Sequence, residues 1–258
     1  KHFGVSVTAC LLIIHTGQME GEHSAKVFSG LTLDGPTTRF GLIGSDLVAD
    51  LDLFGRYGKI EGTAYRRWRS GVKHDAAKIM ELVPEDTHWV NQLGERHDLE
   101  TTWLYPFLKS SDVANGRLSP SKYVLMTQER VESDTTLVSI TAPKTWQYLL
   151  DHSAALDGRK SSIYTNRPRF AIFGVGPYTL APWKVAILGL YKNLDFRVVG
   201  NFNGKPIIVD DTCYYIPCET QEEAEFLCAL LNSEVARGFI KSLAFIDAKR
   251  PITIDVLK

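Results

Sequence analysis

The sequence predicts an α+β fold of mixed or antiparallel sheets with a few flanking helices. Short apolar runs separated by Gly and Asp turns dominate the chain, and the Asn203-Gly204 pair between two such runs predicts a β-hairpin. Helical periodicity is clear in only two segments, residues 142–156 and 220–243. The chain has 258 residues, 44% of them hydrophobic, which is enough for one large domain or two small ones.

The first half of the chain contains mainly strand patterns. The apolar run VSVTACLLII at residues 5–14 is too short to span a bilayer and has no signal-peptide cleavage pattern, so we expect a buried strand. Short strands are also expected at residues 26–31 and 38–43, followed by a helix over residues 45–57 that Ser45 caps. Apolar and polar residues alternate at residues 121–131, which predicts a further strand.

The second half contains the two helical segments. Pro143 stands near the start of the first, and apolar side chains follow it with helical spacing. In the second, Thr220 and Glu223 have the spacing of a capping box. Strands are expected at residues 170–176, 183–191 and 196–217.

The Gly-Val-Gly turn after the apolar run FAIF is a candidate cofactor loop. A dinucleotide loop needs a helix directly after the glycines, and an acid about 20 residues further on that binds the ribose. Asp195 has a suitable distance from Gly176, but Pro177, Pro182 and several β-branched residues lie where that helix should be. The sequence therefore favours a turn that needs positive φ at a glycine over a cofactor site.

The charge and the cysteines restrict the function classes. The net charge is −1, so the total gives no sign of an obligate polyanion binder, although a balanced total can hide a basic face. The four cysteines, Cys10, Cys213, Cys218 and Cys228, have no CxxC spacing and no histidine pair at zinc distance. We expect reduced, buried thiols and a cytoplasmic location.

Basic residues concentrate in two segments, with aromatic residues between them. Residues 159–194 contain six cations and no acid, and the motif YRRWRSGVKHD at residues 65–75 adds four more. Cations and hydroxyls that neutralise and position phosphates are typical of nucleic-acid binding. The alternative is a solvated basic face that acids elsewhere in the fold balance. The candidate DNA-binding residues of these segments are Arg66, Arg67, Trp68, Arg69, Lys73, Arg159, Lys160, Ser161, Ser162, Tyr164, Arg167, Arg169, Tyr178, Lys184 and Lys192.

We expect Arg66, Arg67 and Arg69 to flank Trp68 in a protruding loop, where an arginine fork matches the two acceptors of guanine. Arg159 and Lys160 are expected to contact phosphate. Near the C-terminus, Lys249 and Arg250 are either further phosphate contacts or partners of Asp247.

Several of these strings together resemble a known family. They are RWRSGVKHD, LYPFLKSSDV, the run from Arg159 to Lys192, IIVDDTCYYIP and AFIDAKRPIT. They look like the C-terminal target-recognition part of bacterial adenine-N6 DNA methyltransferases of restriction-modification systems, the class in which recognition follows catalysis. The resemblance implies that residues 24–258 form a target-recognition domain for double-stranded DNA, and it adds Lys109 and Ser110 to the candidate contacts.

The same resemblance implies a missing catalytic half. The chain opens on Lys1 without Met and enters a strand almost at once, so we expect a C-terminal part of a longer protein. Residues 1–23 resemble the last strands of the catalytic domain, which would be the chain's upstream partner. The family's Asn-Pro-Pro-Tyr type motif is absent, because the chain has no Pro-Pro pair. We therefore expect that this chain binds no cofactor and that the parent protein binds S-adenosylmethionine. The missing half would extrude the target base from the DNA duplex. We expect no membrane partner.

Two other function classes remain open. Asp210 and Asp211 at a strand end are candidate Mg²⁺ ligands of a nuclease, although a third acid and a lysine at nuclease spacing are not evident. The structural alternatives for this pair are capping a turn and pairing with an arginine. A protein-interaction module is the other class, in which the basic segments would not converge on one groove. His74 and His97 stand beside acids, and we interpret both as surface polar residues.

Overall fold

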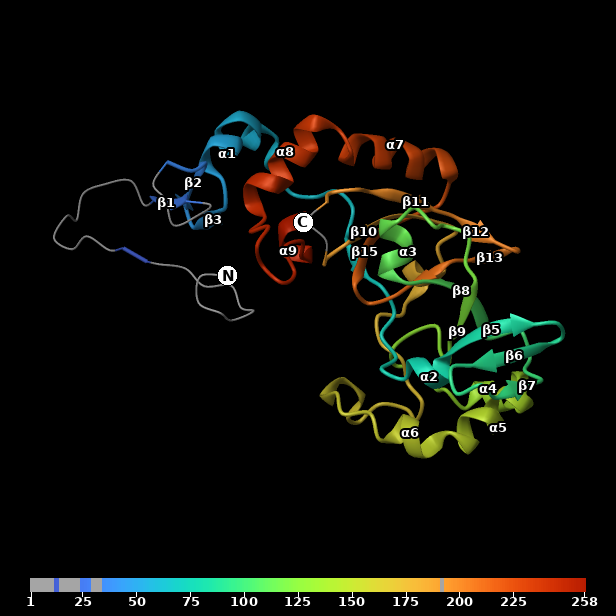
Figure 1. The fold of residues 1–258 in the computed structure, drawn as a ribbon. Coiled ribbons are helices and arrows are strands. Elements are labelled where there is room, and N and C mark those ends of the chain that lie inside the picture. The colour runs from blue at the N-terminus through green and yellow to red at the C-terminus, as the bar shows by residue number, and fades with distance from the viewer. Residues whose placement is uncertain (1–11, 14–23, 29–33, 191–192) are drawn as a thin grey trace.

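The computed structural model describes residues 12–13, 24–28, 34–190 and 193–258, and it has the predicted α+β architecture (Figure 1). Most of the strand predicted at residues 5–14, together with Cys10 and Lys192, lies outside the described residues. Two sheets organise the rest of the chain, each with its own hydrophobic core. Among the described residues, no helix has the length and apolar character that crossing a membrane would need.

The first sheet is antiparallel and has four strands in the order β11-β10-β15-β4. Alternate side chains of β10, one of the two inner strands, enter different hydrophobic cores. Val185 and Ile187 pack toward α7 and α8, whereas Ala186 and Leu188 pack toward α3 and β8. The elements are β4 (Arg69–Ser70), β10 (Trp183–Leu188), β11 (Arg197–Val199), β15 (Cys213–Cys218), α3 (Ser110–Ala114), α7 (Gln221–Leu231) and α8 (Glu234–Leu243).

The second sheet has six strands in the order β14-β8-β9-β5-β6-β7, and only the β14–β8 pair is parallel. Helices α4, α5 and α6 lie at the end of the molecule opposite α7 and α8 (Figure 1) and bury Val138, Leu149 and Leu156 in the core of this sheet. The elements are α2 (Ala77–Met80), β5 (Glu81–Glu85), β6 (His88–Asn91), β7 (Arg96–His97), β8 (Leu104–Leu108), β9 (Lys122–Leu125), α4 (Leu137–Thr141), α5 (Pro143–Asp151), α6 (Ser153–Asp157) and β14 (Ile208–Val209).

Smaller elements complete the described chain. A three-stranded sheet precedes α1, which packs on α8 so closely that a Cβ at Gly238 would lie 2.3 Å from the ring of Tyr57. These elements are β1 (Ser24–Phe28), β2 (Thr37–Ile43), β3 (Asp46–Val48), α1 (Leu51–Tyr57), η1 (Gly58–Ile60), η2 (Ser162–Tyr164), η3 (Pro177–Leu180), β12 (Asn201–Phe202), β13 (Lys205–Pro206) and α9 (Ile254–Leu257).

The two sheets meet where three segments cross, at residues 71–73, 173–174 and 208–210, which we call the chain crossing. Val72 bridges Asp210, and Lys73 bridges Phe173. A Cβ at Gly71 would lie 2.1 Å from the carbonyl oxygen of Asp210, so only glycine fits there. A Cβ at Gly174 would lie 2.4 Å from the carbonyl oxygen of Gly71, and Gly174 has a φ of +72°. The crossing explains why β14 and β15, which follow each other in sequence, belong to different sheets.

The strongest local predictions are confirmed. Asn203 and Gly204 have φ values of 50° and 76° and join β12 to β13 in an antiparallel hairpin, as their tolerance of positive φ predicts. The helix predicted at residues 142–156 is present as α5 and α6. In the segment after Gly176, η3 and then strand β10 occupy the place of the dinucleotide helix.

Other boundaries differ from the prediction because tertiary pairing or capping intervenes. The helix expected from Ser45 begins at Leu51, since residues 46–48 pair as β3 and Asp50 accepts the first amide hydrogen bonds. Residues 170–176 form no strand, and only Phe173 bridges a neighbour. The last helix is two helices, because Ser233 caps α8.

Candidate nucleic-acid interface

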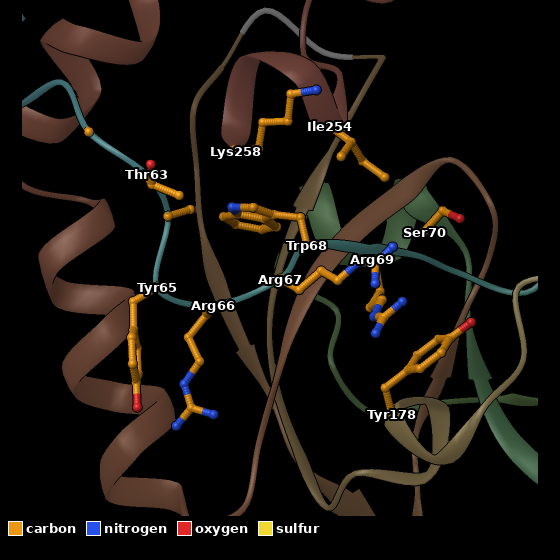
Figure 2. Close-up of a pocket in the computed structure, with 12 residues that line it drawn as sticks. Thr63, Tyr65, Arg66, Arg67, Trp68, Arg69, Ser70, Tyr178, Ile254 and Lys258 are labelled. Carbon is orange, nitrogen blue, oxygen red and sulfur yellow. The ribbon is translucent and has the colours of Figure 1, made fainter.

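A pocket of about 820 Å³ lies beside the four-stranded sheet, and residues 62–70 form most of its wall (Figure 2). We call residues 62–70 the pocket segment. Tyr178 from η3 and Ile254 and Lys258 from the C-terminus complete the lining. The pocket thus joins one of the two predicted basic segments to an aromatic residue from the other.

The pocket segment is fixed at one end and exposed along the rest. Trp68 is only 5% exposed, and its ring centroid lies 5.9 Å from that of Phe196 in the core. Arg69 and Ser70 then pair with β15 as strand β4. These contacts hold the C-terminal end of the pocket segment, whereas residues 62–67 are exposed to solvent. Trp68 is therefore an anchor of the segment.

The three arginines of the pocket segment have different surroundings. Arg66 forms an ion pair with Glu223 at the start of α7. The guanidinium carbon of Arg69 lies 4.2 Å from the ring centroid of Tyr178, a cation–π contact in which the two side chains point toward one another (Figure 2). Among the described residues, Arg67 has neither a hydrogen bond nor an ion pair.

Tyrosines add polar aromatic surface to this arrangement. Tyr65 is 94% exposed and lies beside Arg66, whose guanidinium carbon is 5.4 Å from its ring centroid. Burial raises the pKa of Tyr178, against the opposing effect of Arg69 and Arg67, so its phenol stays protonated near neutrality. A guanidinium without an ion pair and tyrosine hydroxyls are donors suited to phosphate oxygens or to the acceptor edge of a guanine.

The second basic segment has a different role, because most of its cations bind the protein itself. Arg159 donates from Nε to the carbonyl of Leu156 at 2.7 Å, and from Nη1 to the carbonyls of His74 at 3.1 Å and Ala171 at 2.7 Å. Its guanidinium carbon lies 3.8 Å from the ring centroid of Tyr164. These contacts give Arg159 a structural role at this point, and its contact with phosphate stays a prediction.

The remaining arginines of this segment form ion pairs with acids from other elements. Arg169 Nη2 lies 2.7 Å from a carboxylate oxygen of Asp157, and Arg167 Nη1 lies 3.4 Å from one of Glu132. Lys160 and Ser162 are exposed, and Ser161 is partly buried. Among the described residues of this segment, Lys160 and the two serines are expected phosphate contacts that form no ion pair with the protein.

Lys184 also departs from the expectation. Its side chain is buried in β10, where Nζ donates to the carbonyl of Ala181 at 2.7 Å. Burial lowers its pKa to about 7, because the charged ammonium loses hydration. A buried side chain cannot reach phosphate, so the prediction for Lys184 is wrong. Lys192 is not among the described residues, and Lys249 and Arg250 are exposed without an ion pair to the described chain.

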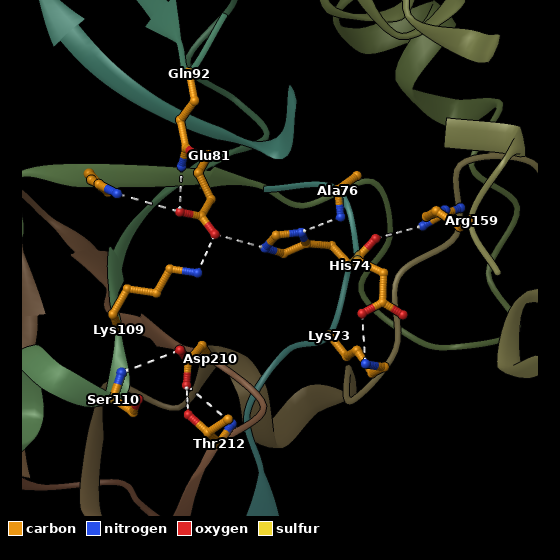
Figure 3. Close-up of polar contacts among 12 residues, drawn as sticks. Lys73, His74, Ala76, Glu81, Gln92, Lys109, Ser110, Arg159, Asp210 and Thr212 are labelled. Carbon is orange, nitrogen blue, oxygen red and sulfur yellow. Dashed lines mark hydrogen bonds and ion pairs between the residues drawn. The ribbon is translucent and has the colours of Figure 1, made fainter. Parts of the chain in front are cut away.

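Lys109 binds a buried carboxylate close to the chain crossing (Figure 3). Glu81 is 1% exposed and forms an ion pair with Lys109, while His74 Nε2 and Lys122 Nζ lie 3.4 and 3.6 Å from its oxygens. Burial would raise the pKa of Glu81, but the hydrogen bonds of His74 and Lys109 and the charge of Lys109 outweigh it and lower the pKa to about 2. Lys109 therefore stabilises the fold at this point.

Lys73, Asp210 and Asp211 belong to the same region. Lys73 Nζ lies 2.7 Å from Asp75 and 3.7 Å from Asp211. Asp210 caps its own turn, accepting from the backbone amide and the hydroxyl of Thr212 at 3.1 and 2.6 Å, and the amide of Ser110 donates to it at 3.3 Å. These contacts support the structural interpretation of the aspartate pair.

Of the two histidines interpreted as surface residues, His74 is buried, whereas His97 is partly exposed. His74 is 6% exposed, and its Nδ1 accepts a hydrogen bond from the amide of Ala76. His97 is partly buried beside Tyr148 and His152. Neither arrangement includes a Ser or Cys nucleophile.

Sequence reasoning also missed other pocket residues, among them Tyr65 and Lys258. Tyr65 directly precedes the arginines, so its position was a usable signal. Lys258 gave none, because only the tertiary fold brings the C-terminus to the pocket.

A relative found by sequence is consistent with the resemblance. The type II methyltransferase M.NspV from Nostoc sp. (strain ATCC 29411 / PCC 7524) is 42% identical over 259 residues, which cover 100% of this chain and 54% of that protein. The chain thus spans about half the length of this relative, and it is homologous to its C-terminal half. No family model matches the sequence. The structure of the type IIL restriction-modification enzyme MmeI in complex with DNA has a TM-score of 0.43 at 12% identity, covering 73% of this chain and 24% of that one.

Proposed function

We propose that this chain is the DNA-recognition part of a restriction-modification methyltransferase, and that the pocket segment reads the duplex. The observation that carries the proposal is Arg67, which has no ion pair, between the exposed Tyr65 and the Arg69–Tyr178 pair, next to the end of the segment that Trp68 and β4 fix. This anchor matters because a bidentate arginine contact needs a defined geometry.

The homology to half of a type II methyltransferase supports a division of labour. Methyl transfer, S-adenosylmethionine binding and extrusion of an adenine would belong to the other half, and this chain would set the target sequence in the cytoplasm. Two features of the chain agree with that division. It contains no Pro-Pro pair, and strand β10 follows the Gly-Val-Gly turn where a cofactor loop requires a helix.

Selection from a randomised duplex library tests the proposal. The chain should enrich a common motif, and a variant that replaces Arg66, Arg67 and Arg69 by alanine should not. Lys78→Ala, an exposed lysine on α2, is the matched control and should select the same motif as the wild type. Selection of no motif, together with an affinity that does not change with salt, would favour a protein partner.

Two further measurements separate the alternative activities. Calorimetry with S-adenosylmethionine should give no saturable one-to-one heat at micromolar cofactor. Incubation with plasmid and Mg²⁺ should leave the DNA intact, because Asp210 is engaged in its own turn. Cleavage that Asp210→Asn and Asp211→Asn abolish would instead establish the nuclease.

A further inference from the structure

Among the described residues, one group of three side chains can share a metal ion, and it lies in the half of the molecule that carries the six-stranded sheet. Glu95 stands in the turn between β6 and β7, His97 in β7, and His152 at the C-terminal end of α5. One ligand atom from each lies within 4.8 Å of the others. Glu95 Oε2 is 2.8 Å from His152 Nε2 and 3.4 Å from His97 Nε2.

These separations suit a small divalent ion. Zn²⁺ binds histidine nitrogen and carboxylate oxygen at about 2.0–2.2 Å, so two ligand atoms on one ion are about 3 to 3.5 Å apart. Two imidazoles and one carboxylate favour a transition metal, because Mg²⁺ and Ca²⁺ prefer oxygen ligands. The side chain of Glu95 is 46% exposed, which leaves the ion open to water on one side.

Neighbouring groups hold the three side chains in position. His152 Nδ1 lies 2.8 Å from the carbonyl oxygen of Tyr148, which can only accept, so Nδ1 carries a proton and Nε2 faces the cluster. Asn91 Nδ2 donates to Glu95 Oε2 at 2.6 Å. The ring of Tyr148 packs against both imidazoles, with centroid distances of 4.5 and 4.4 Å. Metal-ligating histidines commonly have this outer support.

We infer that Glu95, His97 and His152 form a binding site for a divalent transition-metal ion of the Zn²⁺ type, which fastens the end of α5 to the β6–β7 hairpin. The site is separate from the pocket segment and from any catalytic step. Its expected effect is on the stability of the half that carries the six-stranded sheet.

Competition with a chromophoric chelator for Zn²⁺, using protein without a histidine tag, tests the inference. The wild type should bind one ion per chain. His97→Ala is the informative variant, since it removes one ligand but leaves the Glu95–His152 contact intact, and it should weaken binding at least about 10–100-fold. His88→Ala on β6 removes a histidine of the same hairpin outside the cluster and should bind as the wild type does.

Thermal unfolding gives a second readout that does not depend on the chelator. Zn²⁺ should raise the Tm of the wild type and of His88→Ala, but not that of His152→Ala. Melting curves in metal-free buffer show whether each variant is folded. Absence of one-to-one binding by the wild type, or equal binding by His97→Ala, would contradict the inference and leave the cluster as a set of hydrogen-bonded side chains.

Discussion

The pocket segment and the chain crossing contain similar basic residues but use them in opposite ways. In the pocket segment, Arg67 has neither a hydrogen bond nor an ion pair among the described residues, and Arg69 lies over an aromatic ring without an ion pair. At and around the crossing, Lys73, Lys109 and Arg159 each bind carboxylates or carbonyls of the protein. The difference lies in which groups the fold places beside each cation.

Because of that difference, we expect the cations around the chain crossing to stabilise the fold and those of the pocket segment to bind a ligand. A charge that a buried carboxylate or several carbonyls satisfy is costly to remove, because its partners are left unpaired. An exposed charge without a partner contributes little to stability and is available to a ligand. Substitutions on the two sides should therefore affect different measurements.

The largest effect is expected at Glu81. Replacement by Gln leaves Lys109 and His74 without their counter-charge, and it should lower the free energy of unfolding by about 3–5 kcal/mol. Denaturant unfolding at neutral pH measures this loss. In the wild type, the contribution of Glu81 to the free energy of unfolding is fully present above pH 4.5, because the folded-state pKa lies below that value. This contribution is lost as the pH falls towards 2.

The acid-induced loss should be about 3 kcal/mol, from the difference between 4.5 and about 2 in pKa. Glu81→Gln should lack this component of the pH dependence. If the variant and the wild type lost stability in parallel between pH 4.5 and 2, the low pKa of Glu81 would be contradicted.

Arg159→Ala should come next, with a loss of about 2–4 kcal/mol in the free energy of unfolding, because three carbonyls lose their donor. Arg169→Ala is the matched control from the same segment. Its ion pair with Asp157 is exposed, so we expect a loss of about 0–1 kcal/mol. Equal losses in the two variants would contradict the structural role of Arg159.

Arg67→Ala tests the pocket segment, where we expect a change in DNA binding rather than in stability. Its free energy of unfolding should stay within about 0.5 kcal/mol of the wild type. Discrimination at one base pair should fall by about 1–3 kcal/mol, measured by binding to single-position variants of the selected duplex. A uniform loss of affinity over all sequences would mean that Arg67 contacts phosphate rather than a base.

Lys160→Ala should have the smallest effect. This exposed lysine is expected to weaken all duplexes about equally, without a change in base preference. The plot of log affinity against log salt should become shallower by about 0.9, which corresponds to one phosphate contact. An unchanged slope would remove Lys160 from the interface.

Local features were predictable from the sequence because they depend on neighbouring residues. Asn203 and Gly204 tolerate positive φ and so close a hairpin, and prolines after Gly176 prevent a cofactor helix. The break at Ser233 was missed, although a capping serine is a local signal. The resemblance to a methyltransferase likewise rested on contiguous strings, and the homology to M.NspV agrees with it.

Only the tertiary structure decided whether each charged side chain is buried and paired or exposed. Lys109 and Glu81 are 28 residues apart, and His152 and Glu95 are 57 apart, so no local pattern pairs them. Lys184 stands in an acid-free stretch that indicated a basic surface, yet β10 carries it into the core. Burial and pairing depend on long-range neighbours, because desolvation and Coulomb energy follow distance in space rather than separation along the chain.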